Sequence, residues 1–139
     1  MVVHQVFLID SVRHYVSKIR YWYFTKIARR FKTFNTNNGV IATNTIPHNI
    51  KGLKDLAVIR SLALIKPLSV IETLDQDSKL LTIGPRTEGE IFSLIGHGFQ
   101  RKNIAALDLI SYSPWVEVGD MHQMPYPDNS FDAVVMGWV

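Results

Sequence analysis

The chain has 139 residues, of which 47% are hydrophobic and 19% charged, and it has no cysteine. This length supports one hydrophobic core, and the composition is typical of a globular protein rather than a disordered or membrane-embedded one. The lack of cysteine excludes disulfides, thiolate metal sites and a cysteine nucleophile. The opening residues lack the basic region of a signal peptide, so we expect a cytoplasmic protein.

The net charge of +3 conceals two halves of opposite sign. Residues 1–60 contain ten Lys and Arg against two Asp, whereas residues 61–139 contain five basic and ten acidic residues. The first half therefore carries +8 and the second −5. Such a split predicts a basic segment that either binds an anionic partner or docks on the acidic half.

Residues 11–34 are predicted to form one helix, because no Gly or Pro interrupts them and apolar residues recur every three or four positions. Seven apolar side chains would share one side of this helix: Val12, Tyr15, Val16, Ile19, Tyr23, Ile27 and Phe34. The basic and aromatic content allows binding to nucleic acid or to an anionic membrane surface. We favour the alternative of a packing or lid helix with solvated charges.

Residues 35–49 are rich in Asn and Thr and are predicted to be a loop, with a short extended piece at residues 40–42. Residues 50–65 form a second apolar run that should end near Lys66, because Pro67 disfavours helical geometry before it. Residues 1–70 are thus expected to be a basic helical N-terminal region, followed by a second region at residues 71–139.

Four short apolar runs follow, separated by polar or glycine-containing turns, at residues 79–84, 103–109, 115–120 and 131–139. Runs of this length are typical of buried parallel strands, and residues 87–99 between the first two suit a helix packed on the sheet. The pattern predicts an α/β fold with about four parallel strands, preceded by the N-terminal helices.

The ends of these predicted strands hold the residues best suited to bind a ligand. Gly84 follows the first strand, where a strand-to-helix turn brings backbone close to a ligand, unless it serves only a tight turn. Asp108 ends the next strand, 24 positions later, where an acid can accept hydrogen bonds from ribose hydroxyls. Asp120 ends the third.

The order of these features, completed by MPYPDNSFD at residues 124–132, resembles the class I S-adenosylmethionine-dependent methyltransferases of the small-molecule type 11 kind, which carry LPFPDNSFD there. The resemblance covers about residues 78–139. It implies a partial Rossmann-like sheet and a chain that ends before the family's sheet is complete, with Gly137 and Trp138 where the acceptor site would begin.

The resemblance also implies how S-adenosylmethionine would be held. Gly84 and its neighbours would face the methionine part, Asp108 the ribose, and Asp120 the adenine amino group with Met121 against the ring. The implied cofactor-binding residues are Gly84, Pro85, Arg86, Asp108, Leu109, Asp120 and Met121.

The glycine-rich loop departs from the family's pattern. Thr82 stands at its first acid, and Pro85 and Arg86 fill positions where glycine is usual. Glu88 or Glu90 could replace the missing acid near the cofactor's ammonium group, or could serve only as first-turn acids of a helix.

The connection between the second and third strands is also short for a parallel crossover. Either its helix is lost or the third strand is very short. Tyr112 and Trp115 could cover the adenine from this connection, or could pack against a sheet edge.

We expect methyl transfer to a small-molecule or glycan-type acceptor. The alternative is a non-catalytic Rossmann-like module with a basic interaction helix. A dinucleotide-dependent oxidoreductase ranks third, because the G-x-G-x-x-G fingerprint is absent.

No metal site is expected. His48, His97 and His122 are weak candidates for a general base, because the sequence places no carboxylate to orient them; His122, beside Asp120, is the best.

Overall fold

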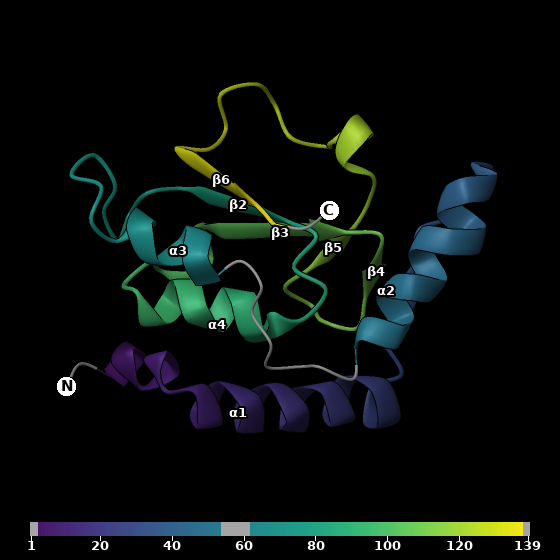
Figure 1. The fold of residues 1–139 in the computed structure, drawn as a ribbon, viewed down its shortest axis with the longest axis horizontal. Coiled ribbons are helices and arrows are strands. Elements are labelled where there is room, and N and C mark those ends of the chain that lie inside the picture. The colour runs from purple at the N-terminus through teal and green to yellow at the C-terminus, as the bar shows by residue number, and fades with distance from the viewer. Residues whose placement is uncertain (1–2, 54–61, 138–139) are drawn as a thin grey trace.

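The sheet is built from the four strands that the sequence predicts, with narrower bounds. The structure is a computed structural model, in which residues 3–53 and 62–137 are described. Its strands are β2 (Leu80–Ile83), β3 (Ile104–Asp108), β5 (Glu117–Val118) and β6 (Ala133–Met136), all parallel, in the order β5-β3-β2-β6. The predicted α/β fold with a parallel four-stranded sheet is confirmed (Figure 1).

The central strand β2 is buried along its whole length because it has a hydrogen-bonded strand on each side. Leu80 faces a core that it shares with Ile104 and Val135 of the neighbouring strands and with Ile91 of the helix below. The strand predicted third, β5, has only two residues, and no helix lies between β3 and β5. Both explanations for the short connection therefore hold.

Helix α4 (Glu88–Gly96) lies against one face of this sheet, as predicted for residues 87–99. Thr87 caps its first turn, accepting a hydrogen bond from the N–H of Gly89. At its other end the N–H of Phe99 donates to the carbonyl of Leu94, and Gly98 has a φ of 106°. This is a Schellman motif, in which glycine supplies the left-handed conformation.

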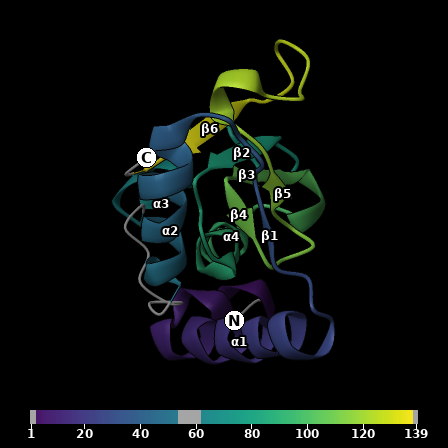
Figure 2. The same cartoon turned by 90° about the vertical axis from the view of Figure 1, so that its right-hand side faces the viewer.

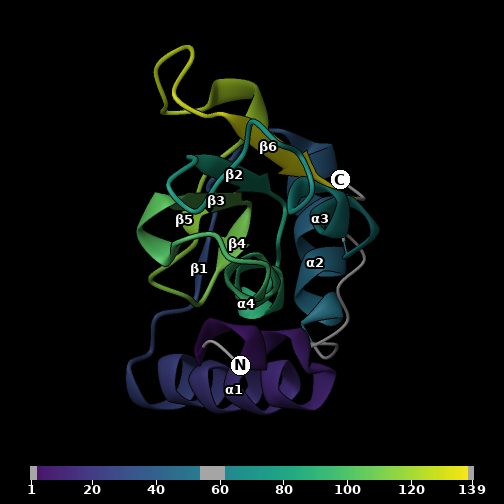
Figure 3. The same ribbon diagram turned by 90° about the vertical axis from the view of Figure 1, so that its left-hand side faces the viewer.

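The N-terminal segment forms a further layer below α4 (Figure 1). A 3₁₀ helix, Val3–Leu8, leads into α1 (Asp10–Trp22), which continues as a π-helical turn, Tyr23–Ile27. The views in Figures 2 and 3 show α1 along the outside of the molecule, with α4 between it and the sheet.

The predicted helix over residues 11–34 is therefore too long. Arg29 adopts a φ of 49°, which ends the helix, and β1 (Lys32–Thr33) pairs antiparallel with β4 (Ile110–Ser111). The N–H of Phe34 also donates to the carbonyl of Leu109 over 2.7 Å. Helix periodicity could not reveal this pairing, because the partner strand lies almost 80 residues away in the chain.

The side of α1 that packs inward is not the apolar one. Arg13 and Ser17 are buried, whereas Tyr15 and Ile19 of the predicted apolar side are exposed. A charged partner in α4, described below, accounts for the orientation.

The loop predicted for residues 35–49 is also mostly helical. A π-helical turn, Ile41–Thr45, continues directly into α2 (Ile46–Gly52). The side chain of Asn38 caps its start, accepting from the N–H of Val40 over 3.1 Å. Pro47 lies in the first turn of α2, just after the π turn. Asn- and Thr-rich composition was thus a misleading loop signal here.

The predicted helix over residues 50–65 falls partly on residues 54–61, which lie outside the described part of the chain. Beyond them, α3 (Leu62–Leu68) includes Pro67 instead of ending near Lys66. Short 3₁₀ turns, Arg101–Asn103 and Met121–Gln123, precede β3 and follow β5.

Candidate functional site

A cavity of about 350 Å³ opens at the carboxyl ends of β2, β3 and β5. Parallel strands place the residues that follow them at one edge of the sheet, and ligands of open α/β sheets bind there. The strand ends contribute Ile83, Gly84, Arg86, Leu107, Asp108, Leu109, Gly119, Asp120, Met121 and His122. The opposite wall is contributed by Ile41, Thr45, His48 and Asn49.

Six of the seven predicted cofactor-binding residues line this one cavity: Gly84, Arg86, Asp108, Leu109, Asp120 and Met121. Pro85 is buried and is not part of the lining. The structure therefore brings together a glycine and two carboxylates that the sequence separates by 36 positions.

The turn after β2 brings its backbone to the cavity through two left-handed residues. Gly84 has a φ of 70° and Arg86 a φ of 55°. The Arg86 guanidinium donates to Oδ1 of Asn49 over 3.2 Å and lies where a side chain at Gly52 would be. Arg86 thus ties the turn to helix α2 and places a positive charge in the cavity wall.

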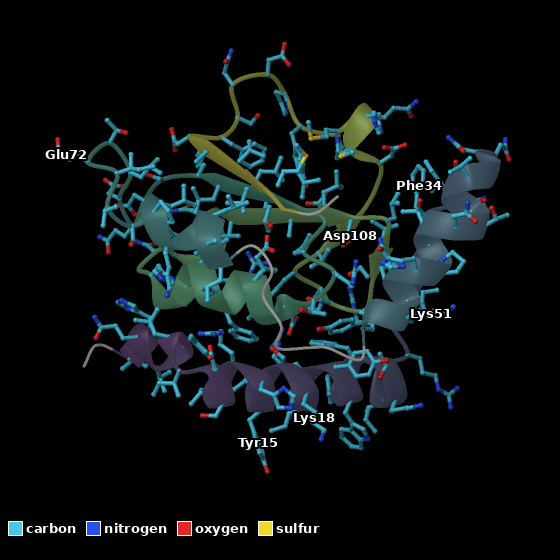
Figure 4. All side chains as sticks on the ribbon, viewed as in Figure 1. Tyr15, Lys18, Phe34, Lys51, Glu72 and Asp108 are labelled. Carbon is cyan, nitrogen blue, oxygen red and sulfur yellow. The ribbon has the colours of Figure 1, made fainter. Side chains whose placement is uncertain are left out.

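Asp108 is only 5% exposed and lies at the end of the sheet that faces α2 (Figure 4). Its Oδ2 accepts from the N–H of Arg86 over 2.7 Å, and its Oδ1 from the N–H of Ile110 over 3.4 Å. Burial raises the pKa of this carboxyl above its ordinary value, and the backbone hydrogen bonds oppose the shift. These backbone bonds leave acceptor capacity on the carboxylate for a ligand.

Asp120 forms a local pair with His122. Its Oδ1 lies 2.8 Å from Nδ1 of the imidazole and accepts from the His122 N–H over 2.9 Å. The hydrogen bonds from His122 hold the pKa of Asp120 below its ordinary value. The expectation that no carboxylate orients a histidine is thereby corrected: Asp120 orients His122 at the cavity.

The wall from α2 and its preceding turn was not expected as part of the site. His48 and Asn49 come from a segment predicted to be a loop at the edge of a separate N-terminal region. No periodicity or motif in residues 35–53 signals this role, since only the chain's path over the strand ends creates it. His97 lies elsewhere, with Nδ1 2.8 Å from the carbonyl of Ser93.

Glu88 and Glu90 do not line the cavity, so neither replaces the missing acid of the loop there. Both oxygens of Glu88 accept from Arg20, over 2.5 and 2.9 Å, and one also accepts from Ser113. Glu90 accepts from the hydroxyl of Thr82. The two acids instead join α4 to α1 and to β2.

Tyr112 and Trp115 do not cover the cavity either. Tyr112 is 1% exposed and packs edge-on against Tyr21, with ring centroids 5.0 Å apart. Trp115 stacks under the guanidinium of Arg20 at 3.9 Å and contacts Phe92. These aromatic residues form the interface between the N-terminal helices and the sheet.

The MPYPDNSFD segment forms hydrogen bonds at the end of the sheet opposite the cavity. Asp132 accepts from the N–H of Lys79 over 2.7 Å and donates its own N–H to the Lys79 carbonyl over 2.8 Å. These bonds align the start of β6 with the start of β2. Asn129 adopts a φ of 59°, and Tyr126 packs edge-on against Phe131.

No cluster of three or more metal-ligating side chains occurs within residues 3–53 and 62–137. In the same part of the chain, no helix combines the length and apolarity that crossing a bilayer requires. Gly137 follows β6, whereas Trp138 lies outside the described residues.

Comparisons with models of protein families, with curated proteins and with solved structures found no match for this chain. The methyltransferase resemblance therefore rests on the residues named above and stays a prediction.

Proposed function

We propose that the cavity at the strand ends binds S-adenosylmethionine and that the chain supports methyl transfer to a small-molecule acceptor. The observation that carries this proposal is the single cavity that joins Gly84, Asp108 and Asp120. Its volume of about 350 Å³ is within the range of small-molecule sites. The strand order is also that of the first half of a doubly wound Rossmann-like sheet, in which the first and fourth strands are neighbours.

The residues of the cavity suit the parts of this cofactor. Asp108 would accept hydrogen bonds from the ribose hydroxyls, and Asp120 from the adenine amino group, while Met121 and Leu109 offer apolar contact to the base and sugar. The Arg86 guanidinium would pair with the carboxylate of the methionine part. A bound S-adenosylmethionine supplies a methyl group that its sulfonium already activates.

The chain's own part in the reaction would be to position the methyl donor and the acceptor and to exclude water. Donor and acceptor react fastest when held in line, so a rigid cavity contributes through orientation. Arg86 and Asn49 hold the two walls together.

The proposal is tested by calorimetric titration of the protein with S-adenosylhomocysteine, with NAD as a comparison ligand. We expect binding of the former, weakened about tenfold or more by Asp120→Ala, because a hydrogen bond to a charged group contributes about 1.5–3 kcal/mol. Asp128→Ala is the matched control, since Asp128 is exposed and is not part of the lining. No binding, or equal loss in both variants, would refute the assignment; preference for NAD would favour a dinucleotide site.

A further inference from the structure

We propose that the outer face of α1, formed by Tyr15, Lys18, Ile19, Trp22 and Lys26, binds the surface of an anionic lipid membrane. This inference is independent of the cavity and of the reaction proposed for it. It rests on which side chains α1 exposes, on the charge around them, and on what its inner face contacts.

The outer face exposes a continuous apolar stripe. Tyr15, Ile19 and Trp22 follow one another at spacings of four and three, which places them on one side of a helix. They are 71%, 58% and 56% exposed. Tyr23 and Ile27, also exposed, extend the stripe through the π-helical turn. A contiguous apolar surface of this kind marks an interaction site.

The stripe is bordered by positive charge alone. Lys18 and Lys26 belong to the same face, and Figure 4 shows Tyr15 and Lys18 extending from α1 on the side away from α4. Arg29, Arg30 and Lys32 follow at its end, all exposed. No Asp or Glu occurs from residue 11 to residue 54. This charge is complementary to anionic headgroups, which attract basic residues next to a membrane.

The inner face of α1 keeps the outer face turned to solvent. Arg20 pairs with the fully buried Glu88, and Arg13 donates to the carbonyl of Phe7 over 2.6 Å. Rotating the helix to bury its apolar stripe would break the Arg20–Glu88 pair and leave a carboxylate without its arginine. The fold therefore presents the stripe constantly, without a conformational change.

The mixture of side chains favours a membrane over a nucleic acid. Nucleic acids attract basic and aromatic residues, but aliphatic side chains such as Ile19 and Ile27 gain little from phosphates. At a bilayer interface, Ile and Trp enter the acyl boundary, Tyr stays at headgroup level, and the long Lys side chains reach the phosphates. The helix would lie in the plane of the surface.

The test is co-sedimentation of the full chain with vesicles of phosphatidylcholine alone or mixed with phosphatidylserine. We expect binding to the anionic vesicles that weakens with added salt, together with a blue shift of tryptophan fluorescence. Ile19→Ser/Trp22→Ser should weaken binding about tenfold or more, and Lys18→Gln/Lys26→Gln should weaken it about as much, at low salt. Circular dichroism and the urea midpoint should match the unsubstituted protein, since all four side chains are exposed.

The matched control is Lys66→Gln/Val70→Ser. These residues are also exposed but belong to α3 and the turn after it, away from α1 in Figures 1 to 3. The change should leave vesicle binding unaltered. The proposal is overturned if anionic vesicles bind no protein, or if the control and the Ile19/Trp22 variant lose binding equally. It is also overturned if a single-stranded oligonucleotide binds through Trp22 while vesicles do not.

Discussion

Helices α1 and α4 pack against each other, yet α4 buries its large apolar side chains whereas α1 exposes many of its own. In α4 the buried residues include Ile91, Phe92 and Leu94, as its apolar sequence predicts. In α1 the buried residues are Arg13 and Ser17, while its aromatic and aliphatic stripe is exposed. The same period of three and four residues thus predicts a helix in both cases but the inward face in only one.

The difference follows from one buried charge. Glu88, in the first turn of α4, has a side chain with 0% exposure and needs a cationic partner. Arg20 supplies it and also stacks on Trp115. An unpaired buried charge costs several kcal/mol, whereas burying one apolar side chain contributes about 1.5–3 kcal/mol. The Arg20–Glu88 pair therefore favours the rotation that turns Arg20 inward.

Among substitutions that test this contrast, removing Arg20 should change the free energy of unfolding most. Arg20→Ala leaves Glu88 buried without its guanidinium, and we expect the free energy of unfolding to fall by about 3–5 kcal/mol in urea titration. Lys18→Ala, an exposed change in the same helix, should alter it by less than about 0.5 kcal/mol. Equal small changes in both variants would show that the pair does not fix α1.

An isoleucine in each helix sharpens the contrast. Ile91→Ala in α4 removes a side chain with 0% exposure from the core, and should cost about 3 kcal/mol. Ile19→Ala in α1 removes one that is 58% exposed, and should change the unfolding free energy by less than about 0.5 kcal/mol. If Ile19→Ala proved as costly as Ile91→Ala, α1 would bury its apolar face in solution.

The two helices also end differently. Gly98 ends α4 with a φ of 106°, so Gly98→Ala should lower the thermal midpoint through backbone strain, at a cost of about 1 kcal/mol. Arg29 ends the helical run of α1 with a φ of 49°, and Arg29→Gly relieves the same kind of strain, so no loss is expected. If Arg29→Gly alone lowered the thermal midpoint, a contact of the Arg29 side chain would contribute more to stability than relief of its backbone strain.

The smallest expected effect on stability concerns Asp108. Like Glu88 it is a buried carboxyl, but its hydrogen bonds come from backbone N–H groups instead of an arginine. Because burial raises the pKa of Asp108, its contribution to stability is full below about pH 4 and is lost as the pH rises through the raised value. The stability of the unsubstituted protein relative to Asp108→Asn should therefore decrease with rising pH in urea titrations. A constant difference, or an increase with pH, would contradict the raised pKa.

The sheet was largely predictable because its signals are local. Each strand is a short apolar run between turn residues, and the run fixes a buried strand whatever lies beside it. Gly84, Asp108 and Asp120 could be placed at one edge because parallel strands align their carboxyl ends. The contributions of His48 and Asn49 could not be predicted, since they depend on a helix crossing those ends from a distant segment.

By itself, the sequence determined the α/β class, the strands and the residues that follow them, because periodicity and turn chemistry act over a few neighbouring positions. Only the tertiary structure decided that residues 32–33 leave the predicted helix to pair with β4, that α1 turns its arginines inward, and that α2 closes the cavity. Each of these depends on a partner far away in the chain: a strand edge, a buried carboxylate or the open end of a sheet. Such partners override local preference. An unpaired buried backbone group or charge costs more free energy than a local departure from the preferred secondary structure.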